Sequence, residues 1–117
     1  MTTQAIQPKQ AVLFIDSGVA DYQTLIEGIK AGTKIVILNA NQDGILQIAE
    51  ILSQHSNVDS VQILSHGNQG QVYLGNATLS QNTLGTYQSA LQTWGHALSE
   101  TADILFYGCH VAKGAVQ

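Results

Sequence analysis

The chain has 117 residues and a formal net charge of −4, from eight acidic and four basic residues. A chain of this length suits one domain and can bury a core without metal or disulfide support. Its composition, 44% hydrophobic and 10% charged, excludes an ordinary disordered chain. The sequence has no basic cluster that could neutralise phosphates, so we expect no nucleic-acid partner.

The N-terminal segment and the hydropathy of the chain indicate neither a secretory signal nor a membrane span. Residues 1–10, MTTQAIQPKQ, are polar and lack the apolar stretch of a signal peptide. We expect them to form a flexible lead, with the domain over 11–117. No apolar run approaches the roughly 20 residues that a spanning helix needs, so we expect no membrane insertion. Cys109 is the only cysteine, which excludes an internal disulfide and leaves the compartment open.

Four short apolar runs predict buried strands, because nearly continuous apolar runs are typical of strands covered on both faces. They are residues 11–16 (AVLFID), 35–38 (IVIL), 61–64 (VQIL) and 103–107 (DILFY). Residues 70–76, GQVYLGN, alternate in polarity with glycines near both ends. This pattern predicts a short hairpin arm over the surface.

Between these strands, apolar residues recur at spacings of three and four, as on one face of an amphipathic helix. The three stripes are Tyr22, Leu25, Ile26 and Ile29; Ile45, Ile48, Ala49 and Leu52; and Leu84, Tyr87, Leu91, Trp94 and Leu98. Strands that alternate with helices predict an α/β fold, a three-layer sandwich with a mainly parallel sheet and helices on both faces. Residues 111–117 look like the start of another helix. We therefore expect the sheet to be truncated after its fourth strand and the domain to continue beyond Gln117.

Two of the predicted strands end in residues that can carry out nucleophilic chemistry. They are followed by Ser65-His66-Gly67 and by Gly108-Cys109-His110. In open parallel sheets, ligands bind outside the carboxyl ends of the strands. If the two strands are neighbours, the His66 imidazole can deprotonate the Cys109 thiol, whose thiolate is the nucleophile. The backbone amides of Gly67 and Cys109 can then stabilise an oxyanion.

These residue types also have other common roles. A lone cysteine in an apolar protein is frequently a buried small hydrophobic side chain, and a lone histidine is frequently structural. His66, Cys109 and His110 could cluster around zinc, but the tight metal-ligand spacings are missing and we expect no metal. Ser65 stands next to His66, yet the chain lacks the G-x-S-x-G motif of a serine nucleophile. From the residues alone, a catalytic dyad and a structural role remain equally open.

Further polar residues are candidates for lining a substrate cleft at this end of the sheet. Asp16 ends the first predicted strand, and helix capping is its main alternative role. Asn68 follows the histidine on the predicted arm, where ordinary loop solvation explains it equally well. The remaining cleft candidates are Ser65, Gly108 and His110.

At these motifs the sequence resembles the caspase-like cysteine peptidases, the clan that holds caspases, gingipains, clostripain, legumain and separase. The clan pattern is an apolar strand that ends in His-Gly, followed later by one that ends in Ala-Cys or Gly-Cys. More narrowly, residues 11–114 resemble a domain family found near the N-termini of very large bacterial, often cyanobacterial, surface proteins rich in adhesin-like repeats. The motifs are VQILSHG (61–67) and ADILFYGC (102–109) for the clan, and FIDSGVADYQTL (14–25), DGILQIAEIL (43–52), LSHGNQGQVYLGNATL (64–79) and ILFYGCHVAKG (104–114) for the domain family.

The resemblance implies a caspase-like, Rossmann-like fold in which Cys109 is the nucleophile and His66 the acid–base residue. It implies an oxyanion hole formed by the backbone amides of Gly67 and Cys109. The expected reaction is thioester-forming cleavage of a peptide or protein substrate, the parent chain included, without cofactor and at an extracellular or cell-surface location. A catalytically inactive module that serves adhesion or assembly is the alternative. Because the clan's later strands would follow Gln117 and its motif does not fix His110, substrate choice stays open.

Overall fold

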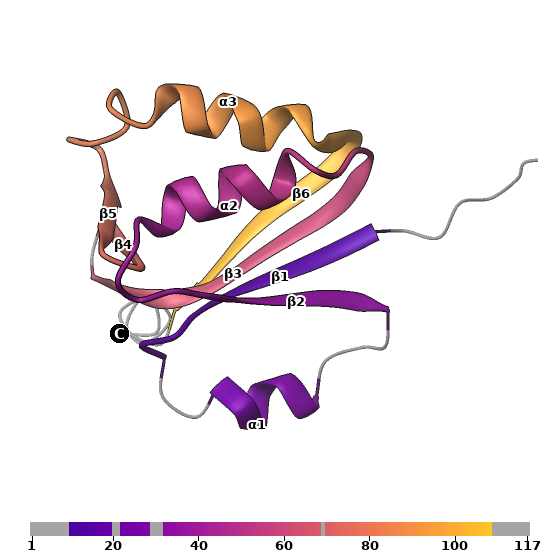
Figure 1. The fold of residues 1–117 in the computed structure, drawn as a ribbon, viewed down its shortest axis with the longest axis horizontal. Coiled ribbons are helices and arrows are strands. Elements are labelled where there is room, and N and C mark those ends of the chain that lie inside the picture. Colours follow the sequence, from indigo (N-terminus) through magenta and orange to yellow (C-terminus); the bar gives the residue numbers. More distant parts are fainter. Residues whose placement is uncertain (1–9, 20–21, 29–31, 69, 109–117) are drawn as a thin grey trace, which may run out of the picture.

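The computed structural model describes residues 10–19, 22–28, 32–68 and 70–108, which form a mixed sheet with helices on both sides (Figure 1). The elements in chain order are β1 (Gln10–Asp16), α1 (Tyr22–Glu27), β2 (Thr33–Leu38), α2 (Gly44–Leu52), β3 (Val58–Asn68), β4 (Gln71–Leu74), β5 (Ala77–Ser80), α3 (Gln88–His96) and β6 (Leu98–Gly108). Helices α2 and α3 lie together on one side of the sheet, and α1 lies on the other (Figure 1). None of the helices in these ranges has the length and apolar character needed to cross a membrane.

Strand β3 is the centre of the sheet. Its first part pairs in parallel with β1 on one edge and with β6 on the other, so that Ile63 is in register with both Phe14 and Phe106. Strand β2 pairs in parallel with the outer edge of β1. The last residues of β3, His66–Asn68, pair antiparallel with β4, which in turn pairs antiparallel with β5. Strand β3 therefore joins a parallel part of the sheet to an antiparallel hairpin.

The prediction of a mainly parallel, caspase-like three-layer sandwich truncated after four strands is wrong, because the sheet is mixed. Strands β4 and β5 extend the sheet from the end of β3, and 48% of the described residues are strand against 26% helix. The hairpin is continuous with the sheet because β3 runs past Leu64 to Asn68. Gly70 and Gly75 have φ angles of 78° and 61°, which let the chain reverse tightly at both ends of β4.

The C-terminal half departs most from the predicted element boundaries. Helix α3 starts at Gln88 rather than at Leu84, and β6 starts at Leu98, a residue predicted to lie on the helix. The residues before α3 form turns, held in part by a 2.9 Å hydrogen bond from the Ser80 backbone amide to Thr83 Oγ1. A threonine hydroxyl that bonds to nearby backbone groups favours a turn over a helix.

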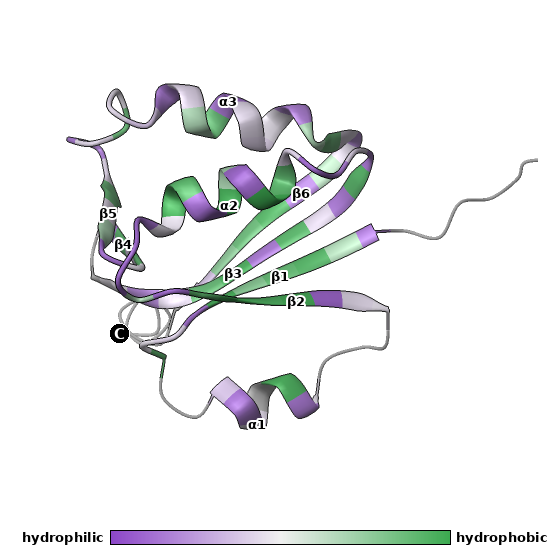
Figure 2. Cartoon of the chain, viewed as in Figure 1, coloured by the Kyte–Doolittle hydropathy of each residue, from purple (hydrophilic) through white to green (hydrophobic). Residues whose placement is uncertain are grey.

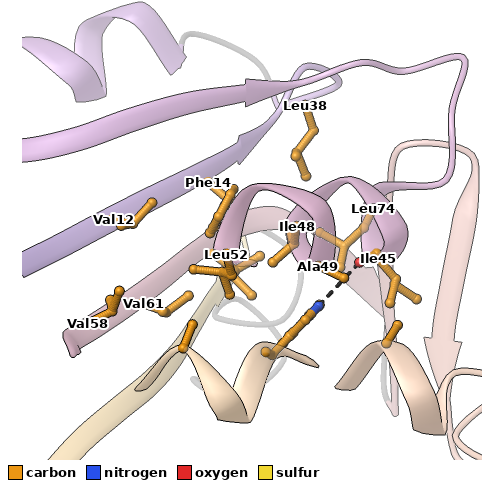
Figure 3. Close-up of a cluster of buried hydrophobic side chains, with 14 of the residues drawn as sticks. Val12, Phe14, Leu38, Ile45, Ile48, Ala49, Leu52, Val58, Val61 and Leu74 are labelled. Atoms are coloured by element: carbon orange, nitrogen blue, oxygen red, sulfur yellow. Dashed lines mark hydrogen bonds between the residues drawn. The ribbon is translucent and has the colours of Figure 1, made fainter. Parts of the chain in front are cut away.

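The main hydrophobic core lies between the sheet and helices α2 and α3 (Figure 3). Its buried residues are Val12, Phe14, Leu38, Ile45, Ile48, Ala49, Leu52, Val58, Val61, Ile63, Leu74, Ala77, Ala90, Trp94 and Ala97. Trp94 Nε1 donates a 3.2 Å hydrogen bond to Ile45 O, the dashed line in Figure 3, so the polar atom of the indole has a partner inside the core. The apolar stripe predicted on α2 is confirmed, because all its members are buried.

The strands on either side of β3 are covered to different extents, although both carry apolar runs (Figure 2). Strand β1 is buried on both faces, as predicted. Its apolar side chains alternate between two faces, with Val12 and Phe14 in the main core and Leu13 and Ile15 opposite. The prediction of burial is wrong for β2, where Ile37 is 41% exposed and only Leu38 is buried. It is also wrong for β6, whose exposed large hydrophobic residues are Leu105 (42%), Phe106 (41%) and Tyr107 (49%). Among the described strands, only β3 pairs with β6.

Candidate functional site

The carboxyl ends of β1, β3 and β6 lie side by side, and the candidate site is formed there. Ile15 is in register with Leu64 on one edge of β3, and Ser65 is in register with Gly108 on the other edge. Residues that are far apart in the sequence therefore meet at one end of the parallel strands. This is the end at which open parallel sheets bind ligands.

His66 is partly exposed at the end of β3, on the face opposite the main core. Val61 and Ile63 belong to the main core. Since side chains alternate along a strand, Ser65 continues on the core face and His66 points to the α1 side. His66 Nε2 hydrogen-bonds to the backbone carbonyl of Gly18. Because a carbonyl oxygen only accepts, Nε2 carries the proton, and Nδ1 is the nitrogen that lacks a proton in the neutral ring.

Asp16 ends β1 with a buried carboxylate that is 6% exposed. Its Oδ2 accepts the backbone N–H of Gly18 at 3.1 Å, and its Oδ1 accepts the backbone N–H of Gly75 at 2.7 Å. Its backbone carbonyl accepts the N–H of Val19 at 3.0 Å, which closes the turn after β1. Asp16 is thus tied to this turn and to the β4–β5 hairpin, whereas its expected alternative role was a helix cap.

Gly18 lies between the Asp16 carboxylate and the His66 ring, where even a Cβ atom would be tightly packed. A Cβ atom on Gly18 would lie 3.0 Å from Asp16 Oδ2 and 3.4 Å from His66 Cδ2. Any larger residue would therefore push on the carboxylate, on the ring or on both. The described part of the site consists of an acid and an imidazole on opposite sides of one glycine.

The other predicted site residues on β3 have restricted access. Ser65 is buried on the core face, so its hydroxyl does not line an open cleft. Gly67 is buried and in register with Val72 of β4. Asn68 is in register with Gln71, at the point where the chain turns into the hairpin. The hairpin therefore covers the edge of β3 directly after His66.

The second half of the predicted dyad follows β6. Gly108 is the last residue of that strand and the register partner of Ser65. Cys109 and His110, the next two residues in the chain, lie outside the described residues. The predicted roles of Cys109 as nucleophile and oxyanion donor, and of His110 as a cleft residue, therefore stay predictions.

Histidines and carboxylates elsewhere in the described chain do not form a second reactive cluster. The ranges described above contain no group of three or more His, Cys, Asp or Glu side chains that could hold a metal ion. His55 Nδ1 lies 2.8 Å from Ile51 O, which it can reach only as a donor. Its Nε2 then accepts from Lys34 Nζ at 3.3 Å. These contacts place His55 at the end of α2 in a structural role.

Asp43 connects three elements near the hairpin. Its Oδ1 accepts the Leu46 backbone N–H at 3.0 Å and so caps α2, and its Oδ2 accepts the Tyr87 hydroxyl at 2.6 Å. The hydrogen bond to Asp43, together with burial and the negative charge of the carboxylate, raises the pKa of Tyr87 above its ordinary value of 10.0. Asp43 is also bridged to Gly75 at the tip of the β4–β5 hairpin.

Two groups of the site, the Gly18 carbonyl and the Gly75 amide, were not found from the sequence. Both belong to the backbone, so no side-chain chemistry marks them. The run Asp16-Ser17-Gly18 after an apolar strand is a turn signal, and it was the one available hint to the Gly18 position. Nothing in the sequence relates Gly75 to Asp16, because their contact depends on how the hairpin packs.

Comparison with known protein families gives a match over most of the chain. The sequence model of a family described as Domain of unknown function (DUF4347) matches residues 12–117. The chain belongs to the DUF4347 family. No curated protein matches this DUF4347 domain. Membership of DUF4347 is compatible with the narrower resemblance drawn from the sequence motifs, while the wider likeness to caspase-like peptidases rests on those motifs alone.

Proposed function

We propose that this DUF4347 domain is a cysteine peptidase that cleaves peptide bonds through a dyad of His66 and Cys109. The observation that carries the proposal is the state of His66 at the end of β3. Its Nε2 donates to the Gly18 carbonyl, so Nδ1 is the nitrogen that can accept a proton from a thiol. The likeness of the two strand-end motifs to those of caspase-like peptidases supports the same assignment.

The pairing of β3 with β6 supports Cys109 as the partner of His66. Leu64 is in register with Tyr107, and Ser65 with Gly108. Cys109 is the next residue in the sequence after Gly108. Register partners on neighbouring strands are about 5 Å apart and point to the same face of the sheet. The proposal requires that the Cys109 thiol comes within reach of the His66 imidazole at this end of the sheet.

The proposed reaction has two steps and needs neither a metal nor a cofactor. His66 Nδ1 takes the thiol proton of Cys109, and the thiolate attacks the carbonyl carbon of the scissile peptide bond. The backbone amides of Gly67 and Cys109 stabilise the oxyanion, and the His66 imidazolium protonates the leaving amine, which yields a thioester. Water, deprotonated by His66, then hydrolyses the thioester. We propose peptide or protein substrates, including the parent chain, at the exterior of a bacterial cell.

Because Cys109 is the only cysteine, the rate of thiol alkylation tests the dyad without interference. We expect iodoacetamide to alkylate Cys109 with a midpoint below the ordinary thiol pKa of about 8.5, and His66→Ala to slow alkylation at pH 7 about tenfold. His55→Ala removes a structural histidine and should leave the rate unchanged. Equal rates in the original chain and in His66→Ala would contradict the proposal. An acyloxymethyl ketone probe that labels the chain but not Cys109→Ala would extend the assignment to peptidase chemistry.

The second candidate function is a catalytically inactive module that serves adhesion or assembly. The exposed apolar residues of β6 favour it, because long apolar edge strands tend to pair with other chains. The alkylation experiment separates the two candidates. A folded chain whose Cys109 reacts no faster than an ordinary thiol, and that no peptidase probe labels, supports the inactive module.

A further inference from the structure

Asp16 has no assigned role in the dyad, yet its carboxylate is buried next to the group that holds His66. A buried carboxylate is costly unless hydrogen bonds stabilise its charge, and here both oxygens accept backbone N–H groups. We propose that Asp16 is a positioning residue that fixes the Gly18 carbonyl and thereby sets the tautomer and orientation of His66. The inference rests on the proposed function, since it assigns how the base of the dyad is held.

Asp16 fixes the two peptide units on either side of Gly18. Its carboxylate accepts the N–H of Gly18, and its backbone carbonyl accepts the N–H of Val19. The N–H of Val19 and the C=O of Gly18 belong to one planar trans peptide, in which they point in opposite directions. With the N–H directed back to Asp16, the carbonyl has to point away from it, and His66 Nε2 is the donor that it meets.

The second carboxylate oxygen of Asp16 connects the turn at Gly18 to the end of β4, the strand that pairs with His66. Asp16 Oδ1 accepts the N–H of Gly75 at 2.7 Å. Gly75 follows β4, whose Tyr73 is the register partner of His66. The Asp16 side chain therefore connects Gly18, which accepts from the imidazole, to β4, which pairs with the His66 backbone. The ring and the backbone of His66 are thereby held relative to each other.

The chemistry favours a carboxylate over an amide at this position. An ionised carboxylate accepts at both oxygens, and its charge strengthens both hydrogen bonds. Asparagine has nearly the same size but one acceptor oxygen, so either Gly18 or Gly75 would face an NH2 group. Asp16→Asn thus removes one of the two bonds while it keeps the volume of the buried side chain.

The test combines ring-nitrogen NMR with alkylation kinetics on the full chain. In the original chain, the 15N shifts of neutral His66 should report the Nε2–H tautomer. We expect Asp16→Asn to raise the Nδ1–H population severalfold and to slow alkylation of Cys109 at pH 7 by on the order of tenfold. Asp59→Asn is the matched control, because Asp59 also accepts a backbone N–H, that of Gln10, but contacts neither Gly18 nor Gly75. It should change neither readout.

Each outcome supports or overturns the inference. A folded Asp16→Asn chain with an unchanged tautomer overturns it, whatever Cys109 does. If Asp16→Asn does not fold, Gly18→Ala takes its place in the test. The added Cβ atom lies between the Asp16 carboxylate and the His66 ring, so this variant should also raise the Nδ1–H population. An unchanged tautomer in Gly18→Ala then overturns the inference. If the tautomer shifts but Cys109 reacts like an ordinary thiol in the original chain, positioning holds and the proposed peptidase function fails.

Discussion

The two strands that flank β3 carry similar apolar sequences but lie in different surroundings. Phe14 of β1 and Phe106 of β6 are both in register with Ile63, yet Phe14 is fully buried and Phe106 is 41% exposed. Strand β1 has paired strands on both edges, whereas β6 pairs with β3 alone among the described strands. An apolar run thus predicts that a strand forms, while its burial depends on which elements pack around it.

The largest expected effect is a direct test of this difference. Phe14→Ala should leave a cavity in the main core and lower the free energy of unfolding by about 3–5 kcal/mol. The matched variant Phe106→Ala should lower it by about 0.5 kcal/mol or less, as is typical of exposed positions. Urea denaturation followed by tryptophan fluorescence measures both. Similar losses for the two variants would show that β6 is covered to the same extent as β1.

A smaller effect is expected where the hairpin packs against the β1 side of the sheet. Gly70 and Gly75 both have positive φ angles, so alanine should cost about 1 kcal/mol at either position. A Cβ on Gly75 would also lie 2.0 Å from Gln42 O, whereas a Cβ on Gly70 meets nothing within 4 Å. Gly75→Ala should therefore destabilise by about 1–3 kcal/mol more than Gly70→Ala. Equal thermal midpoints would contradict the close packing of the hairpin.

The smallest expected effect concerns the bond between Tyr87 and Asp43 and depends on pH. The pKa of Tyr87 is raised in the folded chain. The hydrogen bond to Asp43 therefore contributes its full stabilisation of the fold at pH values below 10.0, the ordinary pKa of tyrosine in the unfolded chain. Its contribution is lost as pH rises through the folded pKa. Tyr87→Phe should cost about 1 kcal/mol at pH 7. The stability of the original chain should then fall more steeply above pH 10 than that of Tyr87→Phe, and parallel curves would contradict the prediction.

The parts of the fold that the sequence predicted are those with a strong local signal. The α2 stripe has helical spacing and follows Asp43, which caps the helix as its residue type suggests. Strand β5 and the start of α3 were missed because residues 77–84 lack a clear period, and side-chain bonds such as that of Thr83 decide their conformation. In the site, His66 was predicted to follow a strand over 61–64, whereas it lies within β3 and pairs with Tyr73 of β4. Its hydrogen bond to Gly18 was not predictable, because that contact joins backbone and side chain across the sheet.

The division of β3 between two partners has a consequence for cooperativity of unfolding. Residues 58–65 pair with β1 and β6, whereas His66–Asn68 pair with β4. The hairpin has one paired neighbour in the sheet, so we expect its amides to exchange with solvent through local opening. The amides of Val61–Leu64 should exchange through global unfolding. His66 then lies on the boundary between a slowly and a rapidly exchanging unit, and opening of the hairpin would release its backbone while the parallel strands stay paired.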